Sequence, residues 1–173
     1  IKKIIYLPNC FMPSDNLKLI SNNETKREDY NLPKDAFVLC CFNKTYKISS
    51  SEFDIWMRIL KNINKSVLWL LKSNDIAMEN LRIEAKKRGI NPDRIIFADK
   101  IPIAEHLNRH KHADLFVDTF AFNAHTTATE SLWAGLPVVT KTGQSFAARV
   151  AGSLLTAVGL PELITETEEE YEA

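Results

Sequence analysis

Short runs of apolar residues alternate along this chain with longer segments in which apolar residues recur every three or four positions. Short continuous apolar runs are typical of strands buried on both faces of a sheet. They predict strands at 37–42, 67–71, 95–98, 115–117 and 138–140. Helical spacing and end signals predict helices at 49–63, 75–88, 102–112, 127–134 and 145–158. Strands that alternate with helices predict an α/β fold, a Rossmann-like parallel sheet with helices on both faces.

Residues 1–36 lack this alternation. Pro8, Pro13 and Pro33 interrupt them, and the stretches SDN and SNNETK are typical of turns or loops. We therefore expect 1–36 to be an irregular lead-in, or linker, and 37–173 to form one domain. The chain begins with Ile and ends in the helix-like TETEEEYEA, so we expect it to be a fragment of a larger protein.

The composition is that of an ordinary soluble globular protein, with 45% hydrophobic and 25% charged residues. Lys+Arg and Asp+Glu are both 22, so no net charge favours nucleic acid or an anionic membrane as a partner. We expect no membrane span, because no apolar run approaches about 20 residues. Cys40 and Cys41 lie in the apolar run FVLCCF, which predicts buried free thiols and a cytoplasmic protein. Four histidines and no zinc-type spacing predict no metal site.

Polar residues follow each predicted strand, at the edge of the sheet where open parallel sheets bind ligands. Lys47 comes just after the first strand, in NKTYK, and could meet a phosphate or be a solvated loop lysine. His106 and Arg109 are three positions apart and share a helix face. They could stack on and hydrogen-bond a flat base, or simply face solvent.

Residues 118–140, DTFAFNAHTTATESLWAGLPVVT, place His125, Thr126 and Thr127 at the start of a predicted helix. Free N–H groups and the helix dipole make such a start an anion site. Thr127 and Glu130 also match a capping box, in which Glu130 would bond back to the helix start. Alternatively, Glu130 could accept both hydroxyls of a ribose. The spacing leaves the two roles of Glu130 open.

Several motifs in the same order resemble the catalytic region of the O-linked N-acetylglucosaminyltransferase family. That family includes SPINDLY-like proteins and many bacterial proteins with tetratricopeptide repeats, and a bacterial repeat protein is the member we expect. The motifs cover roughly residues 5–173 and are YLPNCFMPSD, FNKTYKISSSEFDIWMRIL, SVLWLL, RIIFAD, EHLNRH, ADLFVDT, NAHTTATESLWAGLPVVTKTGQSFAARVA and GLPELI. The resemblance implies the C-terminal half of a GT-B glycosyltransferase, a nucleotide-sugar-binding domain that needs no metal or other cofactor.

The resemblance also implies roles at the phosphate end of a nucleotide. Lys47 would neutralise the charge of the diphosphate, which makes it the catalytic residue of this fragment. Thr126 and Thr127 would donate to the phosphates, with His125 beside them. Lys44 stands where a neutral amide is common and adds a second cation.

Further roles are implied at the base and the ribose. His106 would stack on the uracil, Arg109 would approach the base edge, and the backbone of Ile101 would pair with the base. Glu130, in place of a usual Asp, would hold the ribose, so the resemblance favours binding over capping there. Ile103 lies where the animal enzymes carry a ribose-contacting lysine, so we expect that contact to be lost.

The function implied is the binding of a UDP-sugar, first of all UDP-GlcNAc, for transfer to Ser or Thr hydroxyls of an acceptor protein. The acceptor groove and the catalytic base would lie in N-terminal catalytic and repeat domains outside this chain, so we expect the fragment alone to be inactive. Three alternatives remain. One is a non-catalytic nucleotide-binding module, and another is an O-fucosyltransferase that uses GDP-fucose, as plant SPINDLY-like members do. The third is a structural domain whose helix start binds nothing.

Overall fold

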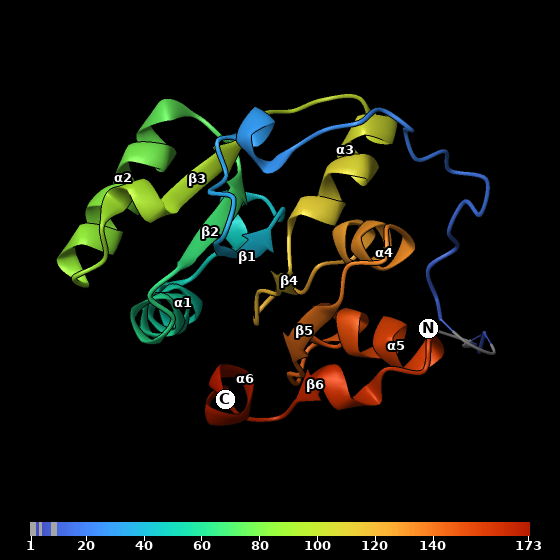
Figure 1. Ribbon diagram of the computed structural model, residues 1–173. Helices are drawn as coiled ribbons and strands as arrows, with labels where there is room; N and C mark the ends of the chain where they lie inside the picture. Colours follow the sequence, from blue (N-terminus) through green and yellow to red (C-terminus); the bar gives the residue numbers. More distant parts are fainter. Residues whose placement is uncertain (1–2, 4, 8–9) are drawn as a thin grey trace.

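A six-stranded parallel sheet forms the centre of the molecule in a computed structural model that describes residues 3, 5–7 and 10–173 (Figure 1). Its strand order is β3-β2-β1-β4-β5-β6. The strands are β1 (Phe37–Cys41), β2 (Ser66–Leu71), β3 (Ile95–Ala98), β4 (Leu115–Val117), β5 (Val138–Lys141) and β6 (Ile164–Thr165). The predicted strands from 37 to 140 are all confirmed. Pro8 of the lead-in and Asn9 of the YLPNCFMPSD motif lie outside the described residues.

The central strands are buried on both faces, as their continuous apolar runs predict. Leu39 of β1 is 1% exposed and pairs with Leu68 of β2 on one side and Leu115 of β4 on the other. Cys40 and Cys41 are buried free thiols, as expected, and burial raises the pKa of both. The core around the central strands is therefore apolar, and the polar side chains that could bind a ligand lie at the strand ends.

Helices cover both faces of this sheet, which confirms the predicted fold class (Figure 1). The helices are α1 (Ser50–Asn62), α2 (Asp75–Lys87), α3 (Ile103–Arg109), α4 (Thr126–Trp133), α5 (Val150–Ala157) and α6 (Glu168–Glu172). One group contains α1, which contacts α6 and reaches α2 through the ion pair of Asp54 with Arg88. The other contains α3, α4 and α5, in which α4 contacts both of its neighbours.

The structure differs from the predicted elements near the C-terminus. Ser145 does cap a helical turn, but this is a 3-10 turn at Phe146–Ala148, and α5 starts only at Val150. Arg149 between them has φ −127° and ψ −2°, which interrupts a continuous helix. Ile164–Thr165 pairs with β5 as a sixth strand that the apolar pattern did not predict. The acidic end folds as α6, in which Tyr171 is 5% exposed.

The lead-in packs against the domain along much of its length. It contains a 3-10 turn at Arg27–Tyr30, and Arg27 forms an ion pair of 2.8 Å with Asp114. Leu32 is 2% exposed. Among the described residues, no helix is long and apolar enough to span a membrane.

Candidate functional site

The order of the sheet strands reverses between β1 and β4. In open parallel sheets, ligands bind in a crevice between the loops that follow two such strands. The loop after β1 carries Asn43 to Lys47, and the loop after β4 runs from Asp118 to the start of α4. The candidate residues of the phosphate end lie on these two loops and on the first turn of α4. The topology therefore selects this crevice as the place to look for a ligand.

A buried amide ties the two loops and α4 together. Asn43 is 2% exposed, and its Nδ2 donates to Asp118 Oδ1 at 3.2 Å and to Thr119 Oγ1 at 2.9 Å. Its Oδ1 accepts a hydrogen bond of 2.6 Å from the hydroxyl of Thr127. Since the amide of Asn43 is buried and all its polar atoms are bonded, the network fixes the first turn of α4 relative to the end of β1.

Asp118 is the centre of the loop after β4. It is fully buried, and burial raises the pKa of its carboxyl to about 6, although four hydrogen-bond donors act in the opposite direction. Two of the donors are the backbone N–H groups of Thr119, at 2.8 Å, and Ala124, at 2.6 Å. The carboxylate thus shapes the loop from within and does not face the crevice.

Lys47 lies over this loop. Its Nζ donates to the carbonyl of Asn123 at 3.0 Å and lies 4.1 Å from the ring centroid of Phe122. Partial burial lowers its pKa. The His125 ring stacks on Phe122 with a centroid distance of 4.7 Å and an interplanar angle of 24°. Lys47 and His125 therefore both contact the ring of Phe122, next to the start of α4.

The start of α4 carries no side-chain cap among the described residues. The capping box considered for Thr127 and Glu130 is absent, because His125 is the N-cap residue and Glu130 points elsewhere. Thr127 gives its hydroxyl to Asn43, so only its backbone N–H is left for a ligand. The hydroxyl of Thr126 is exposed and has no hydrogen-bond partner within the described part of the chain. These N–H groups and one hydroxyl form a typical anion site.

Glu130 lies on α4 and faces α3. Its Oε2 lies 3.8 Å from Nε2 of His106, and its Oε1 accepts a hydrogen bond of 3.2 Å from Nζ of Lys18. Burial lowers the pKa of His106 to about 3, so this ring is neutral. Lys18 belongs to the lead-in and was not among the predicted site residues. Nothing in its local sequence distinguishes it from the other lysines of that segment.

Arg109 lies beneath this part of the site. It is 1% exposed, donates to the carbonyl of Asp99 at 2.6 Å, and lies 2.6 Å from Nδ1 of His106. A guanidinium has only donors, so Nδ1 accepts and the neutral ring carries its proton on Nε2, toward Glu130. Burial lowers the pKa of Arg109 to about 10. Arg109 is thus placed to orient His106 and the Asp99 loop, and its side chain has almost no surface to offer a ligand.

Ile101 follows that loop and is partly exposed. Among the described residues, its backbone N–H and C=O have no hydrogen-bond partner. This leaves one donor and one acceptor just before α3, the helix that carries His106, and the edge of a base requires such a pair.

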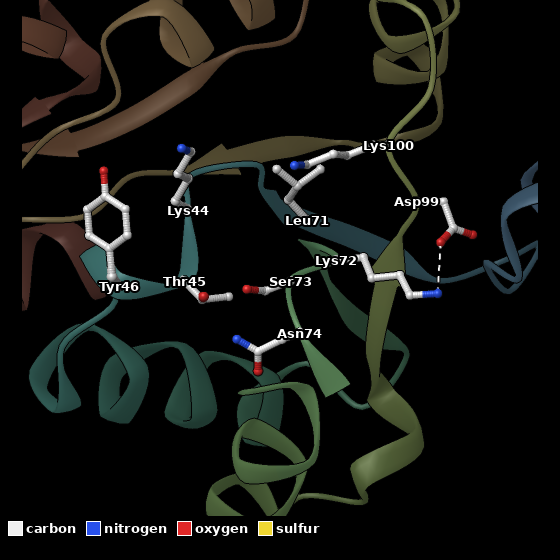
Figure 2. A pocket seen from close by; sticks show the side chains of 9 residues that line it. All are labelled: Lys44, Thr45, Tyr46, Leu71, Lys72, Ser73, Asn74, Asp99 and Lys100. Carbon is white, nitrogen blue, oxygen red and sulfur yellow. Dashed lines mark ion pairs between the residues drawn. The ribbon is translucent and has the colours of Figure 1, made fainter. Parts of the chain in front are cut away.

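Lys44 lines an open pocket of about 550 Å³ between the loops that follow β1, β2 and β3 (Figure 2). Figure 2 shows Lys72 turned toward Asp99, to which it is paired at 3.0 Å. Lys44 is the one residue of the predicted set in this pocket. The pocket and the crevice share one edge of the sheet. In the part of the chain that the structure describes, no group of three His, Cys, Asp or Glu side chains is arranged to hold a metal ion.

The comparison with protein families gives one match. The model of glycosyl transferase family 41 matches residues 18–173. This range includes all the candidate residues and Lys18.

Two curated relatives are similar over most of this chain. The Arabidopsis thaliana protein named probable UDP-N-acetylglucosamine–peptide N-acetylglucosaminyltransferase SEC is 40% identical over 177 residues, 99% of this chain and 18% of its own length. The Caenorhabditis elegans UDP-N-acetylglucosamine–peptide N-acetylglucosaminyltransferase is 45% identical over 147 residues, 85% of this chain and 13% of its own length. The chain thus spans less than a fifth of either relative.

Among solved structures, a mutant of the Thermobaculum terrenum O-GlcNAc transferase has a TM-score of 0.76 and 30% identity. The match covers 82% of this chain and 30% of that chain. The fold is thus that of one part of a GT-B glycosyltransferase, as the resemblance implies.

Proposed function

The chain belongs to glycosyl transferase family 41, and we propose that it is the donor-binding domain of a protein O-glycosyltransferase. The donor in this proposal is a UDP-sugar, first of all UDP-N-acetylglucosamine, and the acceptor is a Ser or Thr hydroxyl of a protein. The Arabidopsis and C. elegans relatives, which are named as UDP-N-acetylglucosamine–peptide N-acetylglucosaminyltransferases, support this choice.

The observation that carries the proposal is the convergence at the crevice between β1 and β4. A lysine from the loop after β1 lies beside the uncapped start of α4, whose N-cap residue His125 carries an imidazole, at the point where strand order reverses. This is the geometry by which open parallel sheets bind the phosphates of nucleotides. A buried network of Asn43 and Asp118 holds the parts in place before any ligand arrives.

The chemistry follows from the charge that develops during transfer. As the acceptor hydroxyl attacks the anomeric carbon, the bond from that carbon to the diphosphate breaks, and negative charge grows on the departing diphosphate. Lys47 and the N–H groups at the start of α4 would stabilise that charge. The proposal involves no metal ion or organic cofactor in this role.

The base and the ribose would lie toward α3. The free backbone groups of Ile101 would pair with the base edge and His106 would stack on the base, while Arg109 orients His106 from below. Glu130 would accept the ribose hydroxyls, since it is not used as a helix cap. Lys44 would add positive charge from the side of the neighbouring pocket (Figure 2).

The proposed function also requires parts of the enzyme that lie outside this chain. An N-terminal catalytic domain and a tetratricopeptide-repeat region would supply the acceptor groove and the base that takes the proton of the acceptor hydroxyl. The isolated chain would then bind the donor without transferring sugar. The buried thiols of Cys40 and Cys41 support a reducing, cytoplasmic setting.

Calorimetric titration of the chain with UDP and with GDP tests the proposal. We expect UDP to bind and Lys47→Ala to weaken it about 10- to 100-fold, because a hydrogen bond to a charged group is worth about 1.5–3 kcal/mol. Lys61→Ala, an exposed lysine at the end of α1, is the matched control. Preference for GDP would indicate a fucosyl donor, and binding of neither nucleotide would contradict the proposal.

A further inference from the structure

Lys18 lies in the lead-in but reaches the middle of the donor site. Its ammonium donates to Glu130 at 3.2 Å, across 112 positions of sequence. The side chain of Lys18 is 27% exposed and that of Glu130 is 11% exposed. The pair is therefore largely shielded from water, unlike most surface ion pairs.

The segment around Lys18 is held in place independently of this pair. The carbonyl of Lys18 accepts a hydrogen bond of 3.2 Å from Nε1 of Trp133 on α4. Three residues on, the backbone N–H of Ser21 donates to the carbonyl of Ala104 in α3 at 3.0 Å. The lead-in thus crosses both helices that border the site, and the position of the ammonium is set by backbone contacts as well as by charge.

The surroundings of Glu130 give Lys18 a chemical role. One carboxylate oxygen faces the ammonium, and the other faces the ring of His106 at 3.8 Å. A carboxylate accepts hydrogen bonds from hydroxyl groups, whereas an ammonium donates to their oxygen atoms. Side by side, the two groups can satisfy both the donor and the acceptor capacity of neighbouring hydroxyls.

We propose that Lys18 is a specificity-determining residue of the donor site, which together with Glu130 binds the ribose hydroxyls and recognises the 2′-hydroxyl. This inference rests on the proposed function, because it requires a nucleotide in the crevice. It adds to that function a residue from outside the sheet domain and a preference for ribonucleotides over deoxyribonucleotides.

Titration of the chain with UDP and 2′-deoxy-UDP tests the role of Lys18. We expect the wild-type chain to bind UDP about 10-fold more tightly than 2′-deoxy-UDP, since the 2′-hydroxyl adds hydrogen bonds to charged groups. Lys18→Met should weaken UDP about 10-fold and leave 2′-deoxy-UDP almost unchanged. Lys18→Arg should retain most of the preference. Lys34→Met, in the same lead-in, is the matched control, because Lys34 is exposed and its side chain makes no hydrogen bond among the described residues.

The outcomes separate the inference from the proposed function. If Lys18→Met changes the affinity for both nucleotides equally, or for neither, Lys18 is only a structural partner of Glu130 and the inference is wrong. Tighter UDP binding by Lys18→Met would also overturn it, since Lys18 would then be blocking the site. Wild-type protein that binds neither nucleotide would contradict the proposed function, and the inference with it.

Discussion

Replacing Tyr171 by Phe should destabilise the domain by removing two buried hydrogen bonds next to the end of β4. The Tyr171 hydroxyl accepts a hydrogen bond of 3.2 Å from Nε1 of Trp56 and donates to the carbonyl of Asp118 at 2.9 Å. It thereby connects α6 and α1 to the end of β4. Phe keeps the ring, which packs edge-on against Phe120, so the change removes only the hydroxyl and its two hydrogen bonds.

The size of the effect follows from burial. Trp56 is 0% exposed, so its indole N–H would be left in the core without an acceptor. An unsatisfied buried donor costs about 1–3 kcal/mol. We therefore expect the free energy of unfolding to fall by about 2 kcal/mol. For a chain of this length, that corresponds to a decrease in Tm of about 4–8 °C.

Differential scanning calorimetry of the chain measures this decrease. Tyr46→Phe is the control, because Tyr46 is 78% exposed and its hydroxyl makes no hydrogen bond among the described residues. Its Tm should stay within about 2 °C of the wild-type value, as surface substitutions usually change stability by less than about 0.5 kcal/mol. Equal melting temperatures for Tyr171→Phe and wild type would refute the account of the hydroxyl as a link between α6 and the crevice.

Three further predictions concern other parts of the site. Burial lowers the pKa of His110 to about 4, so the folded chain keeps this ring neutral while the unfolded chain protonates it below about pH 6.5. The stability that depends on the neutral His110 ring is complete above pH 6.5 and is lost as the pH falls toward 4. Between pH 7 and pH 5, the free energy of unfolding measured by chemical denaturation should therefore fall by about 2 kcal/mol less in His110→Phe than in wild type. Arg109→Lys should weaken UDP binding about 10-fold by calorimetry, because an ammonium cannot replace the guanidinium fork that spans Asp99 and His106; unchanged affinity would contradict this positioning role. Thr127→Val should lower the free energy of unfolding by about 1–3 kcal/mol, because the Thr127 hydroxyl bonds a buried amide that fixes the first turn of α4. Thr126→Val should instead weaken UDP binding without a change in Tm; a lower Tm for Thr126→Val and an unchanged Tm for Thr127→Val would contradict this assignment.

Most of the fold could be predicted from the sequence, because each central strand is a continuous apolar run and each run is followed by a helical pattern. The failures occurred where local signals do not determine the outcome. Ser145 is a good helix cap, but the backbone of Arg149 turns out of the helix four residues later. Ile164–Thr165 is too short to show a pattern, and it becomes a strand only because β5 offers an unpaired edge.

The candidate site was harder to predict, because residue spacing does not reveal burial. Thr126 and Thr127 are adjacent and identical in type, yet only one of their hydroxyls is used inside the protein. The spacing of His106 and Arg109 gave their common helix face correctly, but it could not show that Arg109 lies under the site and not in it. Lys18 had no local signal at all, since its role arises from a fold that brings the lead-in across α3 and α4.

The buried ionisable groups beneath the site have a common arrangement. Asp118, Arg109 and His110 are each 0–1% exposed, and burial shifts the pKa of each against its charged form. Apolar residues of similar size would cost the fold less. Each of the three, however, forms hydrogen bonds with backbone atoms of the segments that carry the site. Asp118 accepts from N–H groups of the β4–α4 loop, and Arg109 donates to the carbonyl of Asp99. His110 bonds the carbonyl of His106 at 2.7 Å. An apolar side chain cannot direct a backbone N–H or C=O. The domain therefore retains these groups at a cost in stability because they orient the loops that would hold the nucleotide in the proposed function. Substitutions of these groups should then affect binding without touching the ligand.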